Sequence, residues 1–206
     1  MKKLMVMAAG LLVAGAASAQ GAFIEGTVGF GKADLGDTSG FSVDNKDTNL
    51  GFTAGYMFNK YIGVEAGYRD LGSVSATASG TVTGTYYGSP FSATGTLNAS
   101  ADANGWLLGV RGNLPINEKF SLNARLGWFN WDADAKATAS GTLTYGGTVY
   151  AGNVTATGSD SGTDIYYGLG ANYNVTKQVG VGVGYTKFKL DDVKVDSWDI
   201  NVNYRF

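Results

Sequence analysis

The sequence contains no histidine and no cysteine among its 206 residues. A chain without these residues cannot build a Ser/His/Asp or Cys/His catalytic arrangement or a common zinc site. We therefore expect that the protein is not an enzyme, and we predict no catalytic, cofactor-binding or metal site. The net charge is −2, and no basic stripe suggests a nucleic-acid partner.

The sequence also lacks a hydrophobic run of about 20 residues, the length that a spanning helix needs. Its most apolar stretch, residues 4–17, follows the basic start Met1-Lys2-Lys3 and leads into Ala17-Ser18-Ala19. This pattern is that of a secretory signal peptide cut after Ala19. We expect a signal peptide at 1–19 and one domain at 20–206. If the mature protein is a membrane protein, it must be a closed β-barrel, because no other segment could span a bilayer as a helix.

Glycine (32 residues) and tyrosine (12 residues) are plentiful, which suits many strands and turns. In the last nine residues apolar and polar side chains alternate, and an aromatic ring stands at each end of the apolar face. Rings at both interfaces are typical of a membrane-spanning strand. The stretch also resembles the C-terminal signal by which bacterial outer-membrane barrels are recognised for assembly, so the barrel assembly machinery is an expected partner. The apolar face consists of Trp198, Ile200, Val202, Tyr204 and Phe206.

Eight stretches alternate in this way, at 22–32, 50–58, 62–69, 106–112, 120–128, 165–173, 179–185 and 198–206. Short turns and longer connections follow one another, so that all turns meet at one end and the long loops at the other. This layout predicts an all-β fold, a transmembrane eight-stranded antiparallel up-and-down β-barrel. A soluble barrel would place apolar residues inside, whereas the expected inward residues here are glycine, threonine, asparagine, glutamate and arginine.

Two stretches resemble the OmpA and OmpX family of eight-stranded outer-membrane barrels. They are Gly55-Tyr56-Met57-Phe58-Asn59-Lys60-Tyr61 with Val64-Glu65-Ala66-Gly67-Tyr68, and the terminal Asn203-Tyr204-Arg205-Phe206. The resemblance covers the transmembrane domain only, so no peptidoglycan-binding domain is expected. Together with the layout it implies the outer membrane of a Gram-negative bacterium, periplasmic termini, and outer-membrane lipid and lipopolysaccharide as partners. The long loops at 33–49, 72–104, 132–163 and 190–197 are then extracellular.

Four charged residues point inward by parity and lie near the periplasmic ends of their strands: Glu25, Glu65, Arg111 and Arg125. One interpretation is a salt-bridge plug in a lumen just wide enough for side chains. The other is a gate whose ion pairs rearrange to pass ions. The plug is the favoured interpretation.

Lys32 and Lys187 continue the outward faces of their strands above an aromatic residue. They are candidates for contact with lipopolysaccharide phosphates at the outer leaflet. The alternative is two solvated lysines.

The two longest loops contain similar Thr-rich stretches at 76–83 and 137–144. Both alternate locally, which predicts β-hairpins that prolong the strands into an extracellular sheet. Its free edge is a candidate site for a partner strand, such as one from a host or phage surface ligand. The candidate anchors are Tyr86, Tyr87, Phe91, Tyr145 and Tyr150. The alternative is a flexible low-complexity surface without a partner.

We therefore expect an integral outer-membrane surface protein with a structural, adhesion or defence role and a lumen plugged by charged side chains. The alternative function is a narrow porin or small-solute transport channel, which would need a continuous lumen or a lateral opening.

Overall fold

The computed structural model describes residues 21–34, 42–44 and 46–206; the expected signal peptide at 1–19 lies outside them. Within these ranges the chain forms nine strands. They are β1 (Gly21–Asp34), β2 (Ser42–Asp44), β3 (Lys46–Met57), β4 (Ile62–Tyr86), β5 (Ser89–Pro115), β6 (Phe120–Tyr145), β7 (Thr148–Asn174), β8 (Val179–Leu190) and β9 (Val193–Arg205). No helix in the described part of the chain is long and apolar enough to cross a membrane.

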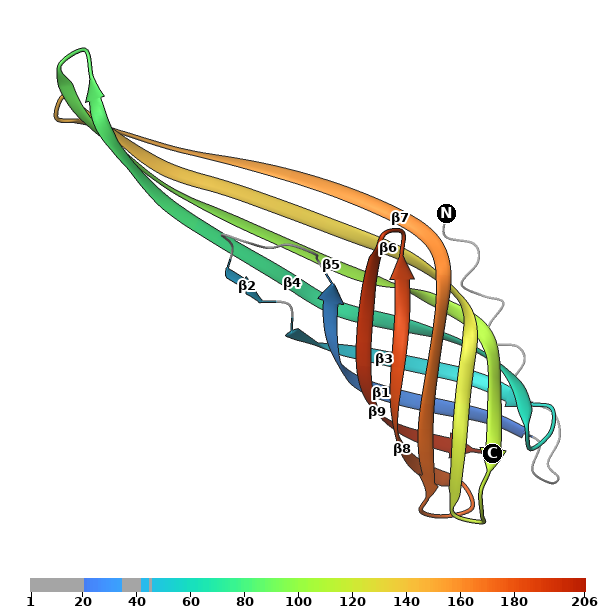
Figure 1. Cartoon of the computed structure of the whole chain (residues 1–206). Helices are drawn as coiled ribbons and strands as arrows, with labels where there is room; N and C mark the ends of the chain where they lie inside the picture. The colour runs from blue at the N-terminus through green and yellow to red at the C-terminus, as the bar shows by residue number, and fades with distance from the viewer. Residues whose placement is uncertain (1–20, 35–41, 45) are drawn as a thin grey trace.

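Eight of these described strands close into a ring by antiparallel pairing, in the order β1, β3, β4, β5, β6, β7, β8, β9 and back to β1 (Figure 1). The short β2 lies outside the ring and pairs with β4 at residues 75–77. The predicted all-β, eight-stranded, antiparallel up-and-down barrel is thus confirmed.

The outer surface of the ring is apolar and is bordered by aromatic residues at both ends. Near the four-residue turns, ring pairs form between Phe120 and Tyr173 at 5.0 Å and between Tyr204 and Phe206 at 5.0 Å. Near the opposite end, Tyr68 packs on Trp106 at 5.2 Å and Tyr185 on Trp198 at 5.1 Å. Aliphatic side chains such as Ile200 and Val202 are exposed between the two belts, as expected of a wall that faces lipid.

The two ends of the barrel differ. One end, called the turn end here, carries the three turns 58–61, 116–119 and 175–178. Each turn is stabilised by a side-chain oxygen that accepts two backbone hydrogen bonds: Asn59 Oδ1, Asn117 Oδ1 and Thr176 Oγ1. Such local capping is why asparagine and threonine favour turns.

At the other end, called the long-strand end here, β4 to β7 continue far beyond their neighbours as a four-stranded sheet (Figure 1). We call residues 73–102 and 133–161 the projecting sheet. Its hairpins close through the pairs Tyr87-Gly88 and Gly146-Gly147, which all have positive φ, as two-residue hairpin turns require. The long segments at 72–104 and 132–163 thus form the β-hairpins that their Thr-rich stretches predict, and these hairpins prolong the strands as one sheet.

The other two expected loops also contain strands. In the segment 33–49, β1 continues to Asp34 and β3 begins at Lys46, with β2 between them. In the segment 190–197, β8 reaches Leu190 and β9 begins at Val193, so that a two-residue turn with Asp191 at φ 52° replaces most of the loop. In β9, Val193 and Val195 alternate with Lys194 and Asp196, a pattern that favours a strand and lets the pairing run on to the turn.

Candidate functional site

The four charged residues predicted to point inward lie together in the lumen, near the turn end. Arg111 Nη2 donates to Glu25 Oε1 at 2.8 Å and to Oε2 at 2.7 Å, and Arg125 Nη2 donates to Glu25 Oε1 at 2.8 Å. Arg111 Nε lies 3.1 Å from Glu65 Oε2. Both carboxylate side chains are fully buried. Two positive and two negative charges therefore neutralise one another across four strands of the wall.

Tyr166 completes this cluster and was not predicted to belong to it. Its hydroxyl donates to Glu65 Oε1 at 2.9 Å, and its ring crosses the lumen over Gly109 and Gly127. A Cβ added to Gly127 would lie 2.7 Å from Cε1 of Tyr166, so the glycine makes room for the ring. The inward glycines of this level are thus part of the packing of the plug.

A second ion pair, between Arg69 and Asp199, lies toward the long-strand end and was also not predicted. Asp199 Oδ2 accepts a hydrogen bond from Thr186 Oγ1 at 2.8 Å, and Arg69 Nη2 donates to Ser197 Oγ at 3.1 Å. Asn49 Nδ2 donates to the same Ser197 oxygen at 2.7 Å. The parity of the strands places these residues inward, but the sequence did not indicate that two residues 130 positions apart would meet.

An apolar layer closes the lumen on the long-strand side. It consists of Leu71, Leu107, Phe129, Trp131, Tyr166, Phe188, Leu190 and Val195, all buried. The rings of Phe129 and Phe188 lie 5.0 Å apart. The expected lumen of only small and polar residues is therefore wrong for this half of the barrel. One reason is that the inward faces of β6 and β8 continue beyond the predicted strand ends, where Phe129, Trp131 and Phe188 are aromatic. The other is that Leu107 and Tyr166 already lie on the inward faces of predicted strands.

Two cavities lie on either side of the ion pairs and the apolar layer. The cavity at the turn end has a volume of about 680 Å³ and is lined by several asparagines, including Asn123, Asn172 and Asn203. The cavity at the base of the projecting sheet has a volume of about 530 Å³, and alanine is the commonest residue in its lining. A small space of about 10 Å³ lies near Glu25 and Asp199, at the level of the ion pairs. The two larger cavities share no lining residue.

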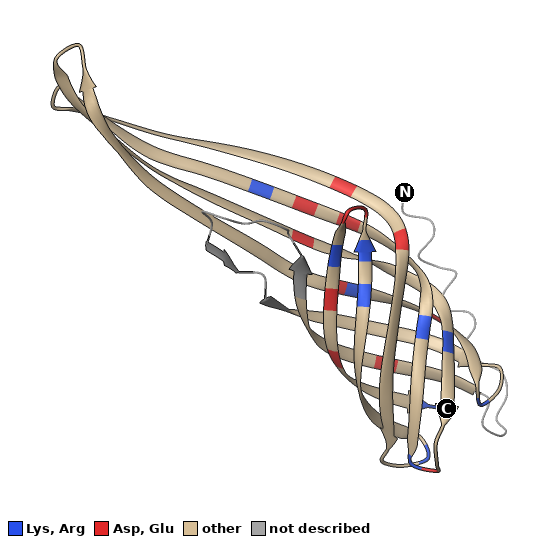
Figure 2. Cartoon of the chain, viewed as in Figure 1, with Lys and Arg blue, Asp and Glu red and all other residues tan. Residues whose placement is uncertain are grey.

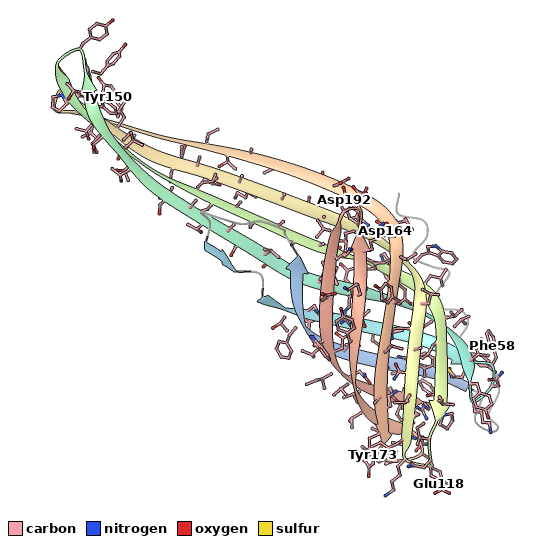
Figure 3. All side chains as sticks on the ribbon, in the orientation of Figure 1. Phe58, Glu118, Tyr150, Asp164, Tyr173 and Asp192 are labelled. Atoms are coloured by element: carbon pink, nitrogen blue, oxygen red, sulfur yellow. The ribbon has the colours of Figure 1, made fainter. Side chains whose placement is uncertain are left out.

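At the long-strand end of the barrel, Asp164 of β7 connects β6 to the turn between β8 and β9 (Figure 3). Its Oδ2 accepts hydrogen bonds from Trp131 Nε1 at 3.0 Å and from the backbone N of Asp191 at 2.9 Å. The hydrogen bond from Asp191, followed by that from Trp131, lowers the pKa of the Asp164 carboxyl. This contact joins the turn between β8 and β9 to the strands that continue into the projecting sheet.

Lys187, a candidate for contact with lipopolysaccharide, lies at this mouth and pairs with Asp196 at 3.0 Å. Asp196 also accepts a hydrogen bond from the Tyr185 hydroxyl at 2.7 Å. The hydrogen bond to Asp196 raises the pKa of the Lys187 amine. The second candidate, Lys32, lies opposite Asp196 in the pairing of β1 with β9. In the sheet, Asp196 of β9 is thus the register partner of Lys32 on one neighbouring strand and of Lys187 on the other.

Three of the five candidate contact aromatics form a cluster at the tip of the projecting sheet. Tyr86 lies 4.6 Å from Tyr87 and 6.4 Å from Tyr145, measured between ring centroids. Tyr150 also lies near the tip (Figure 3), whereas Phe91 is half-buried against Gly84. The five residues of the expected assembly signal are all exposed; four lie on the outer face of β9, and Phe206 directly follows the strand.

Among the described residues, no three histidine, cysteine, aspartate or glutamate side chains group in a way that could hold a metal ion. The geometry defines a class of protein: a small β-barrel with an apolar outer wall and an interior closed by ion pairs and an apolar layer. A model of the outer membrane protein β-barrel domain matches residues 4–206, and the chain belongs to this family. The family resemblance read from the sequence is therefore confirmed at this level.

Solved structures of several outer-membrane barrels have a similar fold. Ail, the attachment invasion locus protein of Yersinia pestis, in complex with the heparin analogue sucrose octasulfate, is 21% identical with a TM-score of 0.46, over 91% of this chain and 97% of Ail. Neisserial surface protein A is 13% identical with a TM-score of 0.44, over 90% and 97% of the two chains. The N-terminal barrel of Pseudomonas aeruginosa OprF is 11% identical with a TM-score of 0.46, over 89% and 97%. No curated protein matches the sequence.

Proposed function

We propose that the protein is a non-conducting surface protein of the outer membrane that holds the projecting sheet outside the cell for contact with partners. In this proposal the termini and the turn end are periplasmic, because bacterial outer-membrane barrels have short periplasmic turns and longer extracellular connections. The protein is not an enzyme, and its role is structural or adhesive, or one of defence.

The separation of the two cavities supports a closed lumen. Between them lie the charged cluster around Glu25 and the apolar layer around Phe129. Water or ions would have to displace buried ion pairs and then cross a packed aromatic layer, and both steps are costly. A narrow porin would require the ion pairs to rearrange and the apolar layer to open at the same time.

Planar bilayer recording tests the closed lumen. We expect conductance near zero for the wild-type protein and for Glu65→Gln, because the apolar layer still blocks the path. Large stable channels that respond to this substitution would support the porin and contradict the plug.

The proposed display of the sheet is tested on cells. Because Ser73 pairs with Asp102 and Ala133 with Asp160, residues 74–101 and 134–159 can each be replaced by a two-residue Asn-Gly turn without shifting the register. We expect the shortened barrel to fold, which its heat-modifiable migration on gels would show, and to lose binding to surface ligands. Equal binding by full-length and shortened proteins would refute this part of the proposal.

A further inference from the structure

The two faces of the projecting sheet differ in chemistry over their whole length. One face carries hydroxyl and amide groups that bond across strands, as between Thr81 and Thr94 at 3.0 Å and between Thr138 and Thr155 at 3.2 Å. The opposite face continues from the apolar layer of the barrel, on which Val74, Ala103 and Ala133 pack. We call this the apolar face.

The larger side chains of the apolar face are exposed. The exposed fractions are 64% for Val82, 66% for Val154 and 41% for Leu143. Lipid can cover the apolar wall of the barrel, but in the proposed function the projecting sheet stands beyond the membrane. Contiguous apolar surface of this kind commonly marks a site of protein association.

The apolar face has transverse rows, in which residues of the four strands lie side by side. One row consists of glycine alone: Gly80, Gly95, Gly141 and Gly152. None of the four has a positive φ. A Cβ on Gly80 or Gly152 would meet no atom within 4 Å, and one on Gly95 would meet only Ser140 O at 3.6 Å, whereas one on Gly141 would lie 2.9 Å from Thr94 O. The fold of a single chain therefore needs glycine at only one of the four positions of this row. Glycine inside a regular strand often marks the close approach of another backbone.

The rows beside the glycines alternate in size. The adjacent row toward the barrel contains Ala78, Leu97, Ala139 and Val154, and the next one consists of Ala76, Ala99, Ala137 and Ala156. On the other side of the glycines, the row nearest the tip contains Val82, Ala93, Leu143 and Tyr150. A line drawn between the rows of Leu97 and Gly95 therefore has a row of large residues at the same distance on one side as a row of small residues on the other. The Leu97 row matches the glycine row, and the Tyr150 row matches the row of four alanines.

We propose that a second copy of this chain covers the apolar face, with the strands of the two sheets antiparallel. The proposed two-fold axis lies between the two facing sheets and runs parallel to the rows, midway between the row of Leu97 and the row of Gly95. It places Leu97 of each copy over Gly95 of the other. The same axis places Leu143 over Ala137 and Tyr150 over Ala156. A two-fold axis along the strands would instead set the glycine row against itself and leave a void. Isologous two-fold pairing is the commonest symmetry among soluble homo-oligomers.

The size and charge of the face suit such pairing. Four strands at about 4.8 Å spacing and eleven residues at about 3.4 Å give a face of about 700 Å² per copy, close to the roughly 800 Å² per partner of a standard interface. Residues 73–101 and 137–159 contain no charged residue, and the charges of the sheet lie at its base (Figure 2). Identical faces can therefore approach without repulsion.

The antiparallel arrangement sets the two barrels at opposite ends of the pair, so they lie in two membranes that face each other. This step rests on the proposed function, in which the sheet projects from the cell. The partner is then the same protein on a neighbouring cell, and many weak pairs across one contact would add up by multivalency.

Single barrels in lipid nanodiscs test the pairing independently of the cell. We expect sedimentation to detect pairs of discs for the wild-type protein. Leu97→Asp should weaken the pairing at least about tenfold, because it buries a carboxylate against apolar groups. The matched control Thr96→Asp adds the same charge on the opposite face of the same strand, and it should leave the pairing intact.

Cysteine substitutions test the register, since the chain has no cysteine of its own. Discs with Leu97→Cys mixed with discs with Gly95→Cys should form the mixed disulfide on oxidation, in preference to either like pair. Discs that remain single, or that cross-link only between like positions, would overturn the inference. If discs pair but protease added to cells does not reach the sheet, the proposed location fails and the pairing stands. If discs remain single and the protease cuts the sheet, the pairing fails and the location stands.

Discussion

The wall of the barrel and the projecting sheet are built from the same strands but have opposite polarity. In the barrel, β5 turns Trp106 and Leu108 outward and Arg111 inward. In the projecting sheet, the same strand has Asn98 on the outer side and Ala99 on the inner side, where it lines the cavity. The apolar residues thus change faces within one continuous strand.

This difference reflects what each face contacts. Where the outer face meets lipid, the outer residues are apolar and the lumen is filled by ion pairs. Beyond the aromatic belt the outer residues carry hydroxyl groups, and the apolar face turns to the inside. Exposure of a face of alanine, glycine and leucine to water is unfavourable, and the proposed second copy would cover this face. Four predictions test this comparison, beginning with the largest effect.

Removal of the central carboxylate should destabilise the barrel most. Glu25→Ala leaves Glu65 as the one carboxylate for both Arg111 and Arg125 in the lumen, so one buried positive charge is no longer neutralised. The loss should be about 3–5 kcal/mol. Urea unfolding in detergent micelles measures it. The same kind of change at Asp102→Ala, on the exposed base of the projecting sheet, should cost at most about 0.5 kcal/mol. Equal losses at the two sites would contradict the buried cluster.

A charge on the lipid-facing side should be costly only in the barrel. Ile200→Arg lies between the aromatic belts on the outer face of β9 and should destabilise the protein by about 2–4 kcal/mol in a bilayer. Thr138→Arg, on the outer face of the projecting sheet, should leave the unfolding free energy nearly unchanged. A similar cost at both positions in vesicles would mean that the polarity of the wall does not change as described.

The junction between the two regions depends on Gly72. It has a φ of 78°, its N–H donates to Asp70 Oδ1 at 2.9 Å, and the pairing of β4 with β5 shifts register here. Gly72→Ala should cost about 1 kcal/mol, because alanine rarely adopts this conformation. Gly112→Ala is the control, since its φ is not positive and a Cβ there meets only Ala124 O at 3.8 Å. Unfolding midpoints of the two variants should therefore differ.

The smallest effect concerns the lysines at the mouth. Replacement of both Lys32 and Lys187 by alanine should change the unfolding midpoint little, since a partly exposed ion pair such as that of Lys187 and Asp196 contributes little to stability. If these lysines contact phosphates, association with lipopolysaccharide should fall about two- to fivefold, the size expected of exposed ion pairs. The binding of labelled lipopolysaccharide measures this change. Unchanged association would refute the contact.

Much of the site could be predicted from single strands. Period-two alternation placed Glu25, Glu65, Arg111 and Arg125 on one side of the wall, because a strand turns every second residue to the same face. The same alternation stops at 59–61 and 113–119, and short turns form there in which the side chains of Asn59 and Asn117 bond to the following backbone. These features are local, so they are visible in the sequence.

The rest depends on which strands meet and at what height. The ion pair of Arg69 and Asp199 and the contact of Tyr166 with Glu65 join residues that are 130 and 101 positions apart. The stagger of the strands around the ring fixes these heights, and no local pattern contains it.

The sequence by itself determined that the chain forms a barrel, since its alternation allows only one face of each strand to meet lipid. Only the tertiary structure decided that the lumen is closed by an aromatic layer, and that the glycines of four strands form a single row. Both features arise from the register between strands, which is set by the pairing of the whole ring and not by any one strand.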